Sequence, residues 1–224
     1  MTGPASALLS QLELARTAAR LDGPSKEELE KAVADLLAVA DLAVPVLTTP
    51  ADEVDFWFVR AVAVAGLAGC EVCITRVSAG VATITAVRRV GSETIYSAAL
   101  GHGTYADDEW LRFDYGVSIG YDLVFDAPGG GATALSGSGY DLRPCATPVT
   151  GLFEVLHGRA AGFVGGPVDP AMAMAMALLL TEALGQVGGR GGHAPGADTS
   201  FLVAGAHAVH YERLSRCIDR EGVL

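Results

Sequence analysis

Positive charge is scarce in this chain of 224 residues. Lysine occurs only at Lys26 and Lys31, and 15 basic residues stand against 26 acidic ones, which gives a formal net charge of -11. Nucleic acids and anionic membranes are bound through clustered positive charge, so this balance argues against both as partners. An acidic surface also gives no general attraction to a phosphorylated molecule, so any site for an anion has to be local.

Long hydrophobic runs are missing as well. The longest apolar helix candidate, residues 171–180, lies between Asp169 and Glu182 and is shorter than the roughly 20 residues that span a bilayer. Residues 1–21 mix Gln, Glu and Arg with apolar side chains, unlike the core of a signal peptide. We therefore expect a cytoplasmic protein without a membrane partner. Its composition, 50% hydrophobic and 18% charged, is that of a globular protein.

Cysteine is also rare, with four residues in all. Cys70 and Cys73 have the CxxC spacing of some zinc and redox sites. They lie in an apolar segment typical of a strand, where residues i and i+3 point to opposite faces, and no second CxxC is present. We therefore interpret them as buried free thiols.

Helix and strand patterns follow one another in an order that indicates an α+β or layered α/β fold. Ser25 is predicted to cap the second helix, and Asp169 to cap a later one with Pro170 at its first position. Turn signals between the apolar segments after residue 70 predict an antiparallel meander. The expected helices are 6–20, 26–40, 149–156, 170–185 and 206–217. The expected strands are 44–47, 59–67, 72–77, 81–90, 93–99, 121–127, 160–164 and 201–204. Residues 101–108 and 188–196 are expected to be loops.

Four segments resemble, in the same order, parts of the inositol-monophosphatase-like sugar phosphatases. Residues 168–185 resemble the family's late helix, in which Trp-Asp-x-Ala-Ala leads to Glu-Ala-Gly-Gly, and residues 200–214 its closing strand and His-containing helix. Residues 146–159 are similar to its Gly-Ser-x-x-Leu helix, which ends in Val-Ala-x-Gly-Arg. Residues 93–111 resemble the meander segment that ends in Gly-x-Gly-Ala-Phe-x-Asn-Gly.

The resemblance implies an αβαβα sandwich that is shortened at its N-terminus. It would form a single domain over residues 1–224. Residues 1–130 would hold the N-terminal helices and the meander, and residues 131–224 an α/β subdomain. The resemblance also implies a homodimer and a small-molecule substrate or ligand.

The metal signature of that family is altered in this chain. The family pattern is Asp-Pro-Ile-Asp-Gly-Thr, followed shortly by Asn-Phe, and its counterpart is residues 49–56, Thr-Pro-Ala-Asp-Glu-Val-Asp-Phe. Thr49 replaces the first Asp, Val54 replaces the Thr, and no Gly-Glu-Glu motif precedes the segment. The positions that match are Pro50, Asp52 and Phe56.

Of the family's acidic ligands, the resemblance therefore leaves Asp52 and Asp169. Magnesium requires several hard oxygen ligands in near-octahedral geometry, so these two could hold a single ion or act as acid and base without metal. We expect that no cofactor is needed, with Mg²⁺ as the alternative. Glu53 is a third catalytic candidate. The candidates for substrate binding are Thr49, Asp55 and Trp57.

Simpler interpretations apply to the same residues. Asp169 is equally explained as a helix cap, Asp52 and Glu53 as solvated turn residues after a proline, and Trp57 as part of the core. Residues 116–120, Gly-Val-Ser-Ile-Gly, match the G-x-S-x-G serine-hydrolase motif, but the expected strand follows the serine instead of preceding it.

His207 and His210 are three residues apart in the last expected helix and could form a metal pair. No third ligand is identifiable, so we interpret them as surface or interface residues.

Three functions fit the altered signature. The first is a small-molecule biosynthetic enzyme or binding protein that works without the full magnesium cluster. The second is a magnesium-dependent phosphomonoesterase of a small sugar or polyol phosphate. The third is a non-catalytic subunit that acts by dimerising.

Overall fold

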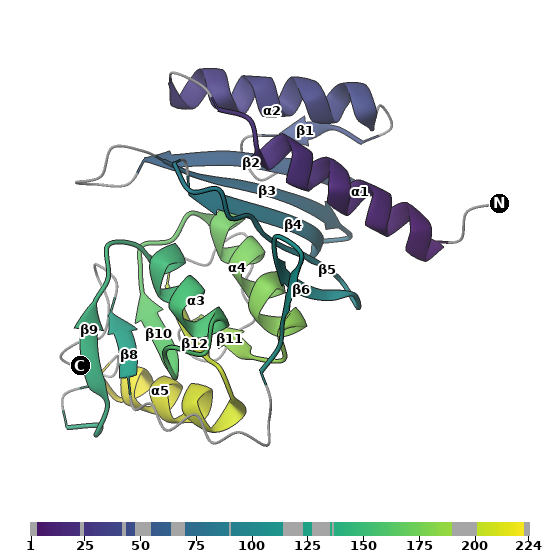
Figure 1. Cartoon of the computed structure of the whole chain (residues 1–224). Helices are drawn as coiled ribbons and strands as arrows, with labels where there is room; N and C mark the ends of the chain where they lie inside the picture. The colour runs from purple at the N-terminus through teal and green to yellow at the C-terminus, as the bar shows by residue number, and fades with distance from the viewer. Residues whose placement is uncertain are drawn as a thin grey trace. The chain divides into compact units, whose positions relative to one another are not determined.

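The computed structural model describes residues 4–22, 25–41, 44–47, 55–63, 70–89, 91–113, 123–126, 135, 137–189 and 201–221. The chain divides into two compact units, Met1–Trp110 and Leu111–Leu224, and Figure 1 labels all of their helices and all of their strands except β7. The prediction that both units belong to one domain stays a prediction.

Two helices open the first unit, α1 (Pro4–Ala19) and α2 (Lys26–Ala40), close to the expected bounds. Ser25 caps α2 as predicted, because its Oγ accepts a hydrogen bond from the Glu28 amide at 3.3 Å. The apolar side chains of α2 at Leu29, Val33 and Leu37 are buried in one core cluster with α1 and the sheet.

A seven-stranded sheet follows, in the order β1-β2-β3-β4-β5-β6-β7. β1 runs parallel to β2, and β2 through β6 pair antiparallel, which confirms the predicted meander. The strands are β1 (Val46–Leu47), β2 (Asp55–Ala63), β3 (Cys70–Ser78), β4 (Val81–Arg89), β5 (Tyr96–Ala99), β6 (Gly103–Ala106) and β7 (Glu109–Leu111). The expectation of a loop over 101–108 is wrong, because β6 lies inside that segment.

The two CxxC cysteines lie on opposite faces of β3, as predicted. Cys70 packs against the core cluster beneath α1 and α2. Cys73 lies on the other face, where its Sγ is 3.4 Å from the Oγ1 of Thr75. Neither cysteine is in a disulfide, and side chains on opposite faces of one strand point away from each other.

The second unit contains a five-stranded sheet in the order β11-β12-β10-β8-β9. β8, β9 and β10 are parallel, whereas β12 is antiparallel to both β10 and β11. The strands are β8 (Leu123–Asp126), β9 (Asp141–Pro144), β10 (Gly162–Gly165), β11 (Gln186–Gly188) and β12 (Leu202–Gly205). β9 and β11 were not expected, and β11 overlaps the start of the predicted loop over 188–196.

Helices cover both faces of this second sheet. α3 (Pro148–Leu156) approaches closely at Gly151, where an added Cβ would lie 3.0 Å from the Cβ of Phe163. α5 (Ala208–Glu221) covers the opposite face. There Leu214 and Ile218 are buried in a cluster with the strand residues Val124, Val164 and Val203.

The remaining helix, α4 (Pro170–Glu182), is the apolar Ala/Met/Leu segment. Nine of its residues are buried, on all sides of the helix, which is the pattern of a helix enclosed by other elements. In the described part of the chain, no helix is both long enough and apolar enough to cross a membrane.

Candidate functional site at the carboxyl edge of the second sheet

The three parallel strands of the second unit end at a common edge. Asp126, the last residue of β8, is in register with Val164 of β10 and with Pro144, the last residue of β9. In α/β sheets, ligands bind outside the carboxyl ends of parallel strands. This carboxyl edge is therefore the candidate functional site of the second unit.

The first helix to begin at the carboxyl edge is α3, which follows β9 directly. The Cys145 amide donates to the Asp126 carbonyl at 3.0 Å, so the connection is tied to the end of β8. Thr147 is the N-cap: its Oγ1 accepts from the Thr150 amide at 3.2 Å and lies 3.0 Å from the Thr150 Oγ1. The arrangement places hydroxyl groups and the positive end of a helix dipole at this edge.

The second helix to begin there is α4, which follows β10. Asp169 is its N-cap and Pro170 its first residue, as the sequence predicted. The Oδ1 of Asp169 accepts a hydrogen bond from the Ala171 amide at 3.0 Å. A carboxylate has about four lone-pair positions, so capping is compatible with a second role toward a ligand or cation.

The other predicted site residues are placed differently. Asp55 is the first residue of β2 in the first unit, where it is exposed and in register with Ser78. Trp57 is fully buried in the core of that unit, and its Nε1 donates to the Asp41 carboxylate at 3.3 Å. The structure thus gives Trp57 a core position. Thr49, Asp52 and Glu53 lie outside the described residues, as does the G-x-S-x-G segment.

The carboxyl edge also contains residues that the sequence did not single out. Asp126 and Cys145 belong to no motif, and Thr147 lies in the segment 146–159 that resembles a family helix but was not named as a site residue. The strand β9, which leads to Cys145 and Thr147, was not predicted. One signal was available for Asp126, since it is an acidic residue at the end of an apolar strand pattern. That signal becomes meaningful only when the strand is known to be parallel to its neighbours.

The two histidines lie at the opposite edge of the sheet, because β12 leads into them and its last residue, Gly205, pairs with the first residue of β10. His207 precedes α5 instead of lying within it. The Nδ1 of His210 is 3.0 Å from the Tyr140 hydroxyl, and the two imidazole centroids are 6.4 Å apart. Among the described residues, no group of three or more His, Cys, Asp or Glu side chains could hold a metal ion.

Comparison with known proteins gives matches only at the level of structure. No family model matches the sequence, and no curated protein matches it. The inositol monophosphatase of Anabaena (Nostoc) sp. PCC 7120 superposes with a TM-score of 0.77 at 16% identity, over 96% of this chain and 97% of that one. SuhB of Mycobacterium tuberculosis superposes with a TM-score of 0.73 at 21% identity, over 98% of both chains.

A third structure, of SaIMPase-II with bound inositol monophosphate, gives a TM-score of 0.78 at 13% identity over 96% of this chain. The likeness therefore includes the N-terminal helices, which the sequence motifs did not reach. At these identities it establishes the architecture. The chain has the layered α/β fold of the inositol monophosphatases.

Proposed function

We propose that the protein binds a small phosphorylated molecule at the carboxyl edge of the second sheet. We further propose that it acts on this molecule as a biosynthetic enzyme, or holds it as a binding protein, without a full magnesium cluster. SaIMPase-II, which shares the fold, has been solved with inositol monophosphate. That ligand supports a small phosphate ester as the class of molecule to test here.

The observation that carries the proposal is the meeting of two helix N-termini at one sheet edge. α3 and α4 both begin there, directly after β9 and β10. The positive end of a helix dipole favours a phosphate. In α3 and α4 the first residue is a proline, which has no N–H, and the Thr150 and Ala171 amides are bonded to the caps. On a chain with a net charge of -11, the two dipoles supply a local attraction that the overall charge does not.

The acidic residues limit the metal chemistry that we propose. Asp169 and Asp126 contribute carboxylates at this edge, and Asp52 would add a third by resemblance to the family signature. Hard oxygen donors of this kind fit one magnesium ion that keeps several water ligands. When bound, the ion would neutralise charge on the phosphate. The replacements at Thr49 and Val54 support a reduced metal site.

A magnesium-dependent phosphomonoesterase is the second candidate, and the fold favours it. The structures with high TM-scores include several inositol monophosphatases, and the alignments cover nearly the whole of both chains. Under this hypothesis Asp52 and Asp169 would hold the ion, with Glu53 as a further acidic group.

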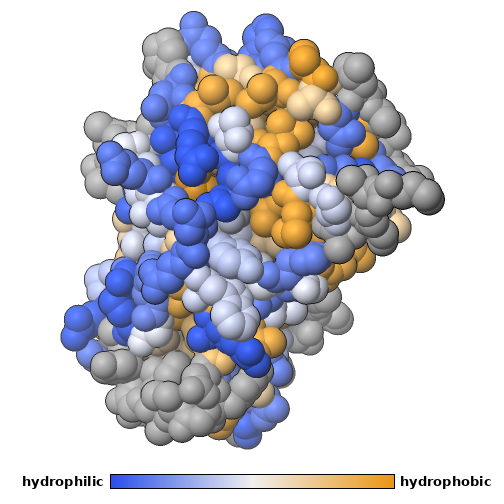
Figure 2. Space-filling model, turned by 45° about the vertical axis from the view of Figure 1, so that its right-hand side comes forward, coloured by the Kyte–Doolittle hydropathy of each residue, from blue (hydrophilic) through white to orange (hydrophobic). Residues whose placement is uncertain are grey.

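A non-catalytic dimeric subunit is the third candidate. Its support is the exposed apolar surface of the first unit, where Val81, Leu100 and Trp110 are each about half exposed or more. Figure 2 shows hydrophobic atoms open to solvent among hydrophilic ones on the face that it presents. An exposed tryptophan is common at protein interfaces.

Ligand binding and phosphate release separate the three candidates. Binding of inositol monophosphate is measured by calorimetry with and without Mg²⁺, and phosphate release by a colorimetric assay. We expect binding that Asp169→Asn weakens when Mg²⁺ is present, because the ion then loses a carboxylate ligand, and no magnesium-dependent release of phosphate. Asparagine also caps helices, so this variant should remain folded. Asp141→Asn, at the exposed start of β9 on the opposite edge, is the matched control.

The other outcomes favour the alternatives. Magnesium-dependent release that Asp52→Asn abolishes would establish the phosphatase and contradict our proposal. A protein that binds no phosphate ester, and whose biological function survives the Asp52→Asn, Asp169→Asn double variant, would be the dimeric subunit.

A further inference from the structure

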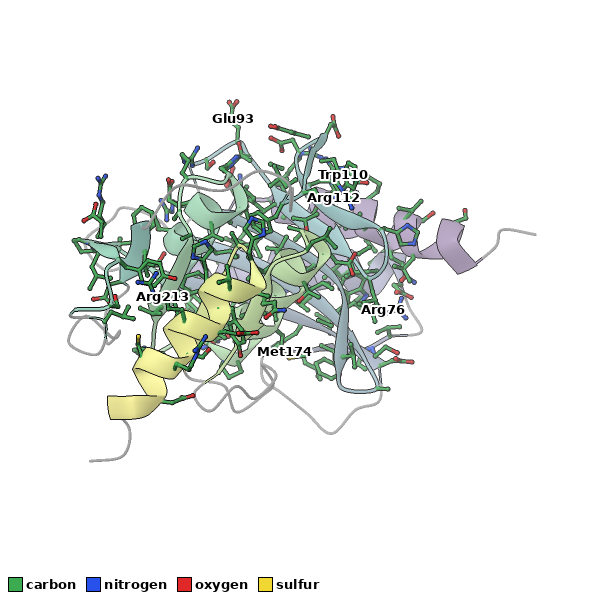
Figure 3. All side chains as sticks on the ribbon, turned by 90° about the horizontal axis from the view of Figure 1, so that it is seen from below. Arg76, Glu93, Trp110, Arg112, Met174 and Arg213 are labelled. Atoms are coloured by element: carbon green, nitrogen blue, oxygen red, sulfur yellow. The ribbon has the colours of Figure 1, made fainter. Side chains whose placement is uncertain are left out.

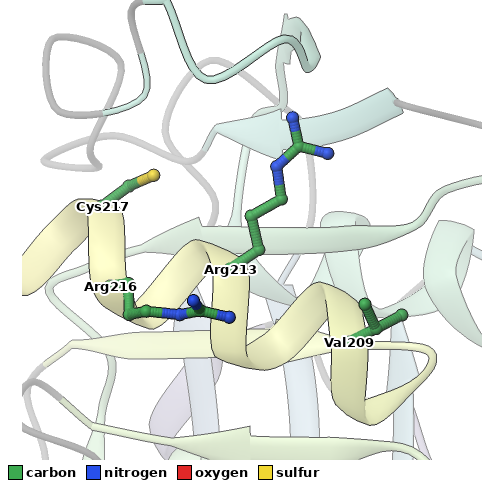
Figure 4. A pocket seen from close by; sticks show the side chains of 4 residues that line it. All are labelled: Val209, Arg213, Arg216 and Cys217. Carbon is green, nitrogen blue, oxygen red and sulfur yellow. The ribbon is translucent and has the colours of Figure 1, made fainter.

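A pocket of about 340 Å³ lies on the outer side of α5, lined by Val209, Arg213, Arg216 and Cys217. Val209, Arg213 and Cys217 follow one another at intervals of four residues, and Arg216 comes three residues after Arg213, so the four share one side of the helix (Figure 4). We propose that this pocket binds a small organic anion, in which a phosphate or carboxylate group contacts the two arginines and an apolar group packs beside them.

Arg213 supplies a positive charge that no carboxylate neutralises among the described residues. Its guanidinium lies 4.5 Å from the centroid of the Tyr140 ring, and its Nη2 donates to the Ser138 carbonyl. Both partners are neutral. Figure 3 shows the side chain beside α5. A guanidinium has five N–H donors in a planar fork, so this anchoring leaves donors for an oxyanion.

The anchoring of Arg213 depends on a close approach to the turn before β9. An added Cβ at Gly139 would lie 2.9 Å from the Nη2 of Arg213, and Gly139 has a φ of +83°. Glycine is therefore the residue that permits both the turn and the contact. The consequence is an arginine held in one place, which lowers the entropic cost of using it to bind a ligand.

Arg216 supplies the second positive charge. Its Nε donates to the Glu212 carbonyl at 3.0 Å, and its Nη2 is 3.7 Å from the Glu212 carboxylate. Both side chains of this pair are more than 60% exposed, so the ion pair is weak. The Arg216 side chain runs along the helix toward Val209, as Figure 4 shows. Two cations and one loosely bound carboxylate leave the pocket net positive.

The rest of the lining is apolar and defines the class of ligand. Val209 is 64% exposed, and the half-buried Cys217 packs against the core cluster beneath α5. Guanidinium groups bind phosphates and carboxylates through paired hydrogen bonds. An anion that also carries an apolar group matches the arginines and the Val209–Cys217 surface together, whereas a bare inorganic ion uses only the arginines.

The pocket is independent of the carboxyl edge. α5 covers the face of the second sheet opposite α3, and the two sites share no residue. Each site also has its own cysteine, Cys145 at the edge and Cys217 in the pocket. The two thiols can therefore report separately on which site a ligand occupies.

Thiol labelling of the full chain tests the proposal. Uncharged iodoacetamide is applied with and without phenylphosphonate, which carries an anion and an apolar ring and cannot be hydrolysed as an ester. Modification of each cysteine is followed by peptide mass spectrometry. At ten times the dissociation constant we expect labelling of Cys217 to slow about tenfold, because occupancy leaves about one site in eleven open. Labelling of Cys145 reports on the carboxyl edge in the same experiment, and Cys70, a half-buried cysteine of the first unit, serves as the internal comparison.

Variants show whether the arginines are responsible. Arg216→Ala and Arg213→Lys should reduce the protection of Cys217, the second because lysine keeps the charge but lacks the fork. Arg20→Ala removes an exposed arginine beside the end of α1 and should leave the protection of Cys217 unchanged. Inorganic phosphate should protect at higher concentration, and benzyl alcohol should not protect. Unchanged labelling of Cys217, protection of Cys145 alone, or equal protection by benzyl alcohol would each overturn the proposal.

Discussion

The buried carboxylate of Glu30 links helix α2 to the sheet of the first unit. This residue of α2 is 9% exposed, and its Oε1 accepts a hydrogen bond from the Ala61 amide of β2 at 2.8 Å. β1 pairs with β2 only at Trp57 and Phe58. Further along β2, the Glu30 carboxylate therefore accepts a backbone hydrogen bond that a neighbouring strand would otherwise accept. Arg60 and Lys26 lie 3.7 and 3.8 Å from the same oxygen.

Glu30→Ala should therefore lower the free energy of unfolding by about 2 to 3 kcal/mol. A hydrogen bond to a charged group contributes about 1.5 to 3 kcal/mol, and a buried amide left without a partner costs a similar amount if water cannot reach it. The two long ion pairs add a few tenths each. For a chain of this size the melting temperature should fall by about 4 to 12 °C.

Two further variants separate the hydrogen bond from the charge. Glu30→Gln keeps an acceptor oxygen, so its loss should be about 1 kcal/mol. Glu27→Ala removes an equal charge from an exposed position of the same helix and should cost less than about 1 kcal/mol. Thermal melting measures the stability, and hydrogen exchange of the Ala61 amide reports on the bond itself. Equal melting temperatures for the Ala and Gln variants, or unchanged exchange at Ala61, would refute the reasoning.

Three other predictions follow from buried groups. The Ser97 hydroxyl is fully buried and has no hydrogen-bond partner in the described structure. Ser97→Ala should therefore raise the free energy of unfolding by about 1 kcal/mol, measured by denaturant titration. A lower free energy of unfolding would contradict this prediction. At Gly162 an added Cβ would lie 2.3 Å from the Ala204 carbonyl oxygen. Gly162→Ala should therefore lower the free energy of unfolding by about 3 kcal/mol or lower the soluble yield. A melting temperature equal to that of the wild type would contradict the close contact. Burial raises the pKa of the Cys70 thiol above its ordinary value of 9.0, so the rate at which Cys70 is alkylated should rise at a higher pH than that of a free thiol. The stability that the protonated Cys70 thiol contributes should be lost above about pH 9, because the thiol ionises first in the unfolded chain. Alkylation as fast as that of a model thiol would contradict the burial.

Features governed by neighbouring residues could be predicted from the sequence. The caps at Ser25 and Asp169 form as expected, because a side-chain oxygen reaches an amide two or three residues away in either case. Gly158 ends α3 with a φ of +68°, which glycine adopts at little cost. The opposite orientation of Cys70 and Cys73 follows from the two-residue repeat of a strand.

Short strands at sheet edges could not be predicted. β9 has four residues, and its side chains are exposed or half-buried, so it lacks an alternating apolar pattern. β11 has three residues beside a glycine-rich segment, and β7, at the edge of the first sheet, also has three. Each forms because a neighbouring strand offers backbone partners.

The sequence by itself determined the helices, their caps, the antiparallel meander and the alternation of strands and helices, because each depends on contacts within a few residues. It also contained the altered signature around Asp52, which lies outside the described residues. The tertiary structure alone decided that β8, β9 and β10 run parallel and end together, since strand direction depends on pairing between distant segments. That pairing brings Asp126 to the same edge as the ends of β9 and β10. The helices that follow these two strands are capped by Thr147 and Asp169, so a helix cap becomes part of a candidate binding site.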